Sequence, residues 1–187
     1  MLILASESPR RRELLHMLGL EFTVITSHVI ECAPEHAAPD ELVRALALQK
    51  ARAVADTHPN DLVVGADTVV YLDGDILGKP HTPENAKAYL SRMQGRKHTV
   101  YTGVAVLSGT YADVRHCCTD VTFAPMSEAE IDWYVSTGEP LDKAGAYGVQ
   151  GPGGIFVERV EGNYFNVIGM PLPLLYRMLR ENGIRFF

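Results

Sequence analysis

The chain has 187 residues, of which 47% are hydrophobic and 21% charged, and its formal net charge is −6. This length predicts one domain with a sizeable core, and the acidic balance excludes the broad basic surface of a nucleic-acid-binding protein. No apolar run approaches the roughly 18 residues of a membrane span, and the short N-terminal apolar run lacks the features of a signal peptide. Three cysteines, two of them adjacent, fit neither a disulfide framework nor a zinc site. We therefore expect a reduced, cytoplasmic protein with no nucleic-acid or membrane partner.

Hydrophobic patterning and helix-end signals predict the elements of the first half of the chain. They are a strand at 2–5, a helix from Ser8-Pro9 to about Gly19, a strand at 22–25, a loop at 27–39, a long helix at 39–58 and a strongly apolar strand at 62–72. The dipeptide Asp73-Gly74 after that strand is typical of a hairpin turn.

The second half continues the alternation of strands and helices. The pattern predicts a helix at 82–93 capped by Thr82, two paired antiparallel strands at 98–109 and 112–126, a helix at 128–138 with a capping box of Ser127 and Glu130, a strand at 155–160 and a helix from Pro171 to about Asn182. Because the order follows no strict βαβ rhythm, we expect an α/β or α+β fold with a mixed sheet flanked by helices.

Three consecutive arginines, Arg10, Arg11 and Arg12, occupy the first turn of the first predicted helix. Unpaired N–H groups already make a helix start positive, so cations there are unfavourable unless an anion binds. Arginine donors matched to phosphate oxygens, beside the capping Ser8, favour a phosphate site. The alternative is that Arg10 pairs with Glu13 and the other arginines are solvated. A Walker A sequence is absent.

Asp67 lies inside an otherwise apolar predicted strand, next to Thr68. A buried carboxylate is destabilising by several kcal/mol unless it is paired, hydrogen-bonded or bound to metal. The functional interpretation is a general base or metal ligand, and the alternative is a structural hydrogen bond.

Three further residues are candidates on weaker grounds. Glu31 lies in the predicted loop, and loop glutamates are usually solvated. Lys50 lies on the long helix, and Lys79 precedes a proline on an extended segment, which presents it rigidly for phosphate contact. A plain surface lysine is an equally good interpretation of Lys79.

The segment at 142–154 is rich in glycine and contains Gln150. Dense glycine lets the backbone approach a flat ligand closely, and the amide of Gln150 matches the N3–H and O4 edge of uracil or thymine. The alternative is a turn-rich connection without a ligand.

Six motifs in a fixed order resemble the Maf family of nucleoside triphosphate pyrophosphatases. They are "LASESPRRRELL", "ALQKARAV", "GADTVVYLDGDILGKP", "HTVYTGVAV", "LDKAGAYGVQGPGG" and "GNYFNVIGMPLPLL". The resemblance covers nearly the whole chain. It implies one domain over 1–187, with two lobes around a nucleotide cleft and an elongated mixed sheet like that of inosine triphosphatases. It also implies a homodimer and a divalent cation, Mg²⁺ or Mn²⁺.

The family cleaves nucleoside triphosphates to a monophosphate and pyrophosphate, and "GADTVV" with "GAYGVQG" resembles its dTTP/UTP branch. Together with the arginine cluster, the resemblance assigns Asp67 as proton acceptor, Arg12, Thr68 and Gln150 as specificity positions, Ser8, Arg11, Lys50 and Lys79 as phosphate contacts, and Glu31 and Asp67 as metal ligands. The chain departs from the family at "SES", which brings Glu7 near the phosphates, and at "VIEC", which has one acid where relatives often have two.

Three alternatives stay open from the sequence. The first is the 7-methyl-GTP branch of the same family. The second is a regulator of septum formation that senses nucleotides without turnover. The third is an interaction protein whose arginines bind a carboxylate or a phosphopeptide.

Overall fold

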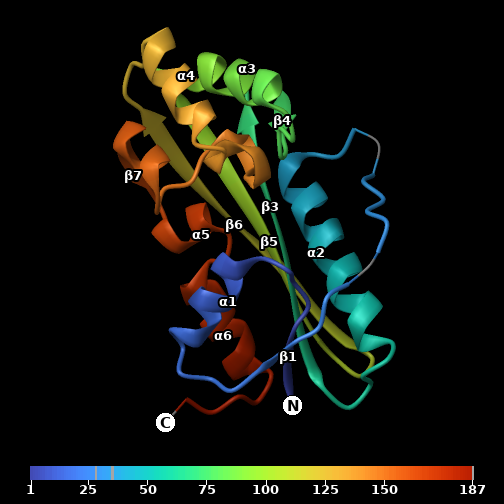
Figure 1. Ribbon diagram of the computed structural model, residues 1–187. Coiled ribbons are helices and arrows are strands. Elements are labelled where there is room, and N and C mark those ends of the chain that lie inside the picture. The colour runs from blue at the N-terminus through green and yellow to red at the C-terminus, as the bar shows by residue number, and fades with distance from the viewer. Residues whose placement is uncertain (28, 35, 187) are drawn as a thin grey trace. The chain divides into compact units, whose positions relative to one another are not determined.

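A mixed sheet of seven strands runs through the described residues of the computed structural model, which are 1–27, 29–34 and 36–186 (Figure 1). Its strand order is β2-β1-β3-β5-β6-β7, with β4 paired to β3. The strands are β1 (Leu2–Leu4), β2 (Thr23–Val24), β3 (Leu62–Leu72), β4 (Asp75–Leu77), β5 (Lys97–Ser108), β6 (Tyr111–Phe123) and β7 (Val157–Glu161). The predicted mixed α/β fold is confirmed.

Strand pairing in the sheet is parallel around β1 and includes the predicted hairpins. Strand β1 pairs in parallel with β2 and β3, whereas β4 is antiparallel to β3. Asp73 and Gly74 both have positive φ, 54° and 90°, as a two-residue hairpin turn requires. Only two residues connect β5 to β6, so this neighbouring pair is a hairpin as well.

Three of the described helices begin at the capping residue that predicts them. The helices are α1 (Pro9–His16), α2 (Pro39–Ala55), α3 (Pro83–Met93), α4 (Glu128–Ser136), α5 (Tyr164–Ile168) and α6 (Leu172–Glu181). Ser8 and Thr82 accept N-cap hydrogen bonds, and Ser127 with Glu130 forms the predicted capping box. Helix α5 was not predicted, because five residues are too few to show a helical period. No helix among the described residues is long and apolar enough to cross a membrane.

The described residues form two compact units. The first comprises residues 1–67, 102–117 and 169–187, and the second comprises 68–101 and 118–168. In the first unit, α2 packs closely on the sheet. A Cβ atom on Gly65 would lie 2.5 Å from the carbonyl oxygen of Ala47, and one on Gly103 would lie 2.1 Å from that of Val43. Glycine at these two positions is therefore what allows the close approach of α2.

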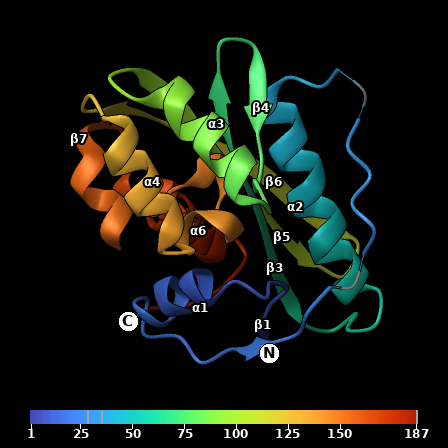
Figure 2. The same cartoon turned by 45° about the horizontal axis from the view of Figure 1, so that its top comes forward.

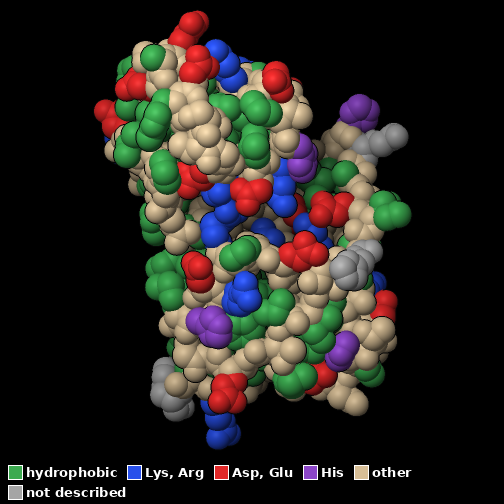
Figure 3. Space-filling view, viewed as in Figure 1, with side chains coloured by type: hydrophobic (Ala, Val, Ile, Leu, Met, Phe, Trp, Pro, Cys, Tyr) green, Lys and Arg blue, Asp and Glu red, His purple; other side chains and the backbone are tan. Residues whose placement is uncertain are grey.

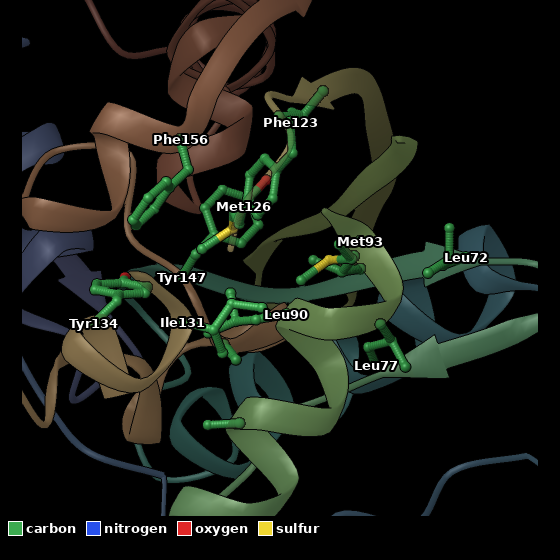
Figure 4. Packing of buried hydrophobic residues seen from close by; sticks show 14 of the residues in the cluster. Leu72, Leu77, Leu90, Met93, Phe123, Met126, Ile131, Tyr134, Tyr147 and Phe156 are labelled. Carbon is green, nitrogen blue, oxygen red and sulfur yellow. The ribbon is translucent and has the colours of Figure 1, made fainter. Parts of the chain in front are cut away.

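The core of the second unit lies beneath α3 and α4, which are side by side in both ribbon views (Figures 1 and 2). Figure 4 shows the labelled members of this core: Leu72, Leu77, Leu90, Met93, Phe123, Met126, Ile131, Tyr134, Tyr147 and Phe156. The face drawn in Figure 3 carries both acidic and basic side chains.

One buried histidine belongs to the second unit. His98 is 2% exposed, packs edge-on against Phe123 and Tyr147, and its Nε2 atom lies 2.9 Å from the Tyr147 hydroxyl. Burial lowers the pKa of His98 to about 4, and the nearby charge of Asp120 opposes this shift. The imidazole is therefore neutral at pH 7.

The lowered pKa of His98 predicts that the free energy of unfolding decreases in acid. Between pH 6.5 and pH 4 the unfolded chain binds more protons at His98 than the folded chain, so stability falls as pH falls through this window. The full effect is about 3 kcal/mol. We expect His98→Phe, which cannot titrate, to lose that much less stability than wild type between pH 7 and pH 4 in urea unfolding. Parallel pH profiles for the two proteins would contradict the assignment.

Candidate active site

The start of α1 is organised by two serines. The Ser8 N–H donates to the Ser6 hydroxyl at 3.3 Å, and the Ser8 hydroxyl accepts from the Arg11 N–H at 3.5 Å. The first turn of α1 contains no acidic residue. No carboxylate in this turn therefore neutralises the positive N-terminal end of α1. A helix end of this kind favours a bound anion.

The three arginines have different environments. Arg11 Nε donates to the Gly169 carbonyl at 2.9 Å, and Nη1 donates to the Ser6 hydroxyl at 3.4 Å. Burial lowers the pKa of Arg11, while the charges of Asp67 and Glu31 act in the opposite direction. Arg11 thus ties the start of α1 to the segment before α6.

Arg12, by contrast, is exposed and forms no ion pair with any residue that the structure describes. The alternative ion pair between Arg10 and Glu13 is also not formed in the described chain. Arg12 is thus the exposed member of the cluster, and its guanidinium is open to solvent.

A buried ion pair joins α2 to β3. Lys50 Nζ lies 2.5 Å from Oδ1 of Asp67 and 2.8 Å from Oε1 of Glu31. Asp67 is only 8% exposed, so the prediction of a buried carboxylate within β3 is confirmed. Its partner is this lysine, and the ammonium compensates the loss of hydration.

Glycine explains how Lys50 reaches Asp67. A Cβ atom on Gly65 would meet the Ala47 carbonyl and lie 2.8 Å from the Ala51 nitrogen, so β3 and α2 touch along this turn of the helix. Lys50 lies in the same turn, and Asp67 follows Gly65 by two residues, which puts both on one face of the strand. The close contact therefore sets the ammonium against the carboxylate.

The loop that contains Glu31 is fixed by Gln49, a residue that the sequence pattern did not mark as functional. The Cys32 N–H donates to Gln49 Oε1 at 3.1 Å, and Gln49 Nε2 donates to the Cys32 carbonyl at 2.6 Å. These two hydrogen bonds between one side chain and the backbone of Cys32 fix the loop beside Lys50. The only available signal was that Gln49 precedes Lys50 in "ALQK".

The remaining candidates belong to the second unit. Thr68 follows Asp67 in β3 and is half-buried, whereas Lys79 and Gln150 are exposed. The Gly145 N–H donates to the Gly78 carbonyl at 3.1 Å, so the segment of Lys79 is bonded to the glycine-rich segment of Gln150.

The acidic residues fit a hard divalent cation. No group of three or more His, Cys, Asp or Glu side chains converges within the described ranges. Glu31 and Asp67 nevertheless share one ammonium group, so two carboxylates already face a common cation. Mg²⁺ is commonly bound by one or two carboxylates, with water and substrate phosphates completing its shell. The donor set therefore suits Mg²⁺ or Mn²⁺ in the presence of substrate.

Comparison with known proteins identifies the family. The Maf-like protein family matches residues 1–182. The chain belongs to this family. A protein of Symbiobacterium thermophilum named dTTP/UTP pyrophosphatase is 49% identical over 186 residues, which cover 100% of this chain and 96% of the relative. A protein of Moorella thermoacetica with the same name is 51% identical over 185 residues, covering 98% and 95%.

The fold also has a relative among solved structures. The Ham1 protein of Staphylococcus aureus superposes with a TM-score of 0.55 at 14% identity, covering 97% of this chain and 99% of that one. At this identity the likeness concerns the fold alone, and it confirms the predicted architecture.

The different environments of the arginines predict different effects on stability. Arg11→Ala removes the bond to the Gly169 carbonyl and should lower the free energy of unfolding by about 2 kcal/mol. Arg12→Ala removes a cation from a helix start and should leave stability unchanged or raise it by about 0.5 kcal/mol. Urea unfolding at pH 7 compares the two, and equal losses would contradict the structural role of Arg11.

Proposed function

We propose that this protein hydrolyses dTTP and UTP to the monophosphate and pyrophosphate. The observation that carries the proposal is about 50% identity, along essentially the whole chain, with relatives named dTTP/UTP pyrophosphatase. The local chemistry supports it, because one unit combines an uncompensated helix start with a buried carboxylate held by a lysine.

The phosphate contacts follow from the charges. The start of α1, with Ser8 and Arg12, offers backbone and guanidinium donors to an oligophosphate. Arg11 adds positive charge next to this turn, and Lys50 and Lys79 supply ammonium groups for the phosphates. These cations stabilise the pyrophosphate leaving group, whose developing charge dominates phosphoryl transfer.

Asp67 is the proposed proton acceptor. Its carboxylate orients a water for attack on the α-phosphorus and takes its proton, a role that requires a fixed position. The Lys50 ammonium holds Oδ1 in place, and Glu31 completes the same charged cluster. Glu31 and Asp67 would also hold Mg²⁺ or Mn²⁺, which when bound would neutralise phosphate charge.

Base selection is assigned to Gln150 and Thr68. The Gln150 amide carries one acceptor and two donors, which suffices for the N3–H and O4 edge of uracil or thymine. A site built for such bonds rejects a mismatched base, because buried polar groups are then left unpaired. We further infer that the protein acts in the cytoplasm and as a homodimer.

A pyrophosphate-release screen tests the function. Purified protein with Mg²⁺ or Mn²⁺ should release pyrophosphate fastest from dTTP and UTP among the common nucleotides and 7-methyl-GTP. Asp67→Asn keeps the shape and removes the base, so turnover should fall by about 10²–10⁴. A preference for 7-methyl-GTP would place the chain in the other branch, and binding without turnover would favour the regulator.

A further inference from the structure

Two polar side chains lie directly beneath the glycine-rich segment of the second unit. Tyr134 comes from α4 and is completely buried beside Ile131 and Phe156 (Figure 4). Glu139 begins the short helical turn Glu139–Asp142 that follows α4 and is half-buried. The proposed function uses neither residue.

These side chains bond the backbone on both sides of Gln150. The Tyr134 hydroxyl accepts from the Gly148 N–H at 3.1 Å, and Glu139 Oε2 accepts from the Gly153 N–H at 3.0 Å. Burial, together with the nearby Glu139 carboxylate, raises the pKa of Tyr134, so the hydroxyl keeps its proton. These two hydrogen bonds form a network with one anchor before Gln150 and one anchor after it.

The backbone of the segment is pressed onto the same two side chains. A Cβ atom on Gly151 would lie 1.9 Å from Glu139 Oε1, and one on Gly153 would lie 2.2 Å from the Tyr134 hydroxyl oxygen. Glycine at these positions is thus explained by contact with the network. Lys143 Nζ donates to the Glu139 carbonyl at 2.8 Å, which fixes the turn that carries the carboxylate.

We propose that Tyr134 and Glu139 are positioning residues that fix the backbone around Gln150 and thereby set the preference for uracil and thymine over cytosine. The physical reason lies in the amide itself. A glutamine on a mobile loop can turn its acceptor or its donor toward the base, and the turned amide suits cytosine. Discrimination then requires that the amide meet the base from one fixed position, and a fixed backbone on both sides of Gln150 is a condition for that. This inference rests on the proposed role of Gln150.

The test compares kcat/KM for UTP and CTP in five variants, one of which is the conservative Glu139→Gln. Glu139→Ala and Tyr134→Phe remove the anchors, and Gln150→Leu removes the amide itself. Asp120→Ala is the matched control, because this half-buried carboxylate in the same unit accepts hydrogen bonds from Lys97 and Thr99, away from the glycine-rich segment. Exchange of the Gly148 and Gly153 amide hydrogens is measured in each protein.

We expect the UTP to CTP ratio of kcat/KM to fall about tenfold in Glu139→Ala and in Tyr134→Phe. Exchange of the two amides should accelerate by a similar factor in the variant that loses each bond. Glu139→Gln should retain most of the ratio, because its amide oxygen still accepts from Gly153. Asp120→Ala should lose thermal stability and keep both the ratio and the exchange rates.

The outcomes separate this inference from the proposed function. If wild type shows no preference for UTP, or Gln150→Leu keeps it, the proposed role of Gln150 fails, and the exchange rates alone decide whether the two residues hold the segment. If the preference is present and depends on Gln150, an unchanged ratio in both Glu139→Ala and Tyr134→Phe overturns the inference, whatever their melting temperatures. Unchanged exchange in both also overturns it.

Discussion

The contact between Lys50 and Asp67 is the constraint on which the candidate site depends. A carboxylate in the middle of an apolar strand is tolerated only with a compensating partner. Helix α2 supplies that partner because Gly65 lets its backbone touch β3. The same helix turn carries Gln49, which fixes the loop of Glu31. The packing of this one turn of α2 on β3 therefore positions Lys50, Asp67 and Glu31.

The Lys50–Asp67 pair adds little net stability to the packing of α2 on β3, because both charged groups lose hydration when they are buried. Apolar side chains of similar volume often stabilise a buried position as well as an ion pair does, or better. The network around Tyr134 and Glu139 is polar for a different reason, since it pairs two backbone N–H groups that apolar side chains would leave without an acceptor. In both units, polar groups fix a part of the chain that the proposed chemistry needs: the Asp67 side chain in the first and the backbone on both sides of Gln150 in the second.

The sequence predicted what local chemistry determines. The cap at Ser8, the Asp73-Gly74 turn and the burial of Asp67 each follow from a few adjacent residues, and each is confirmed. It did not separate Arg11 from Arg12, because the difference is a bond to a carbonyl 158 residues away. Tyr134 and Glu139 were missed for a similar reason, since α4 and the glycine-rich segment meet only in the folded chain. The roles of all the candidate site residues toward substrate and metal stay predictions, those of Asp67, Arg12 and Gln150 included.

The central claim is that the Lys50–Asp67 pair is kept for chemistry rather than for stability. The most direct test is the free energy of unfolding of the Lys50→Met/Asp67→Leu double variant, measured by urea denaturation beside its UTP turnover. We expect a stability within about 1 kcal/mol of wild type, because both charges leave together, and turnover reduced by at least about 10². A double variant that unfolds several kcal/mol more easily, or one that still turns over UTP at the wild-type rate, would contradict the account.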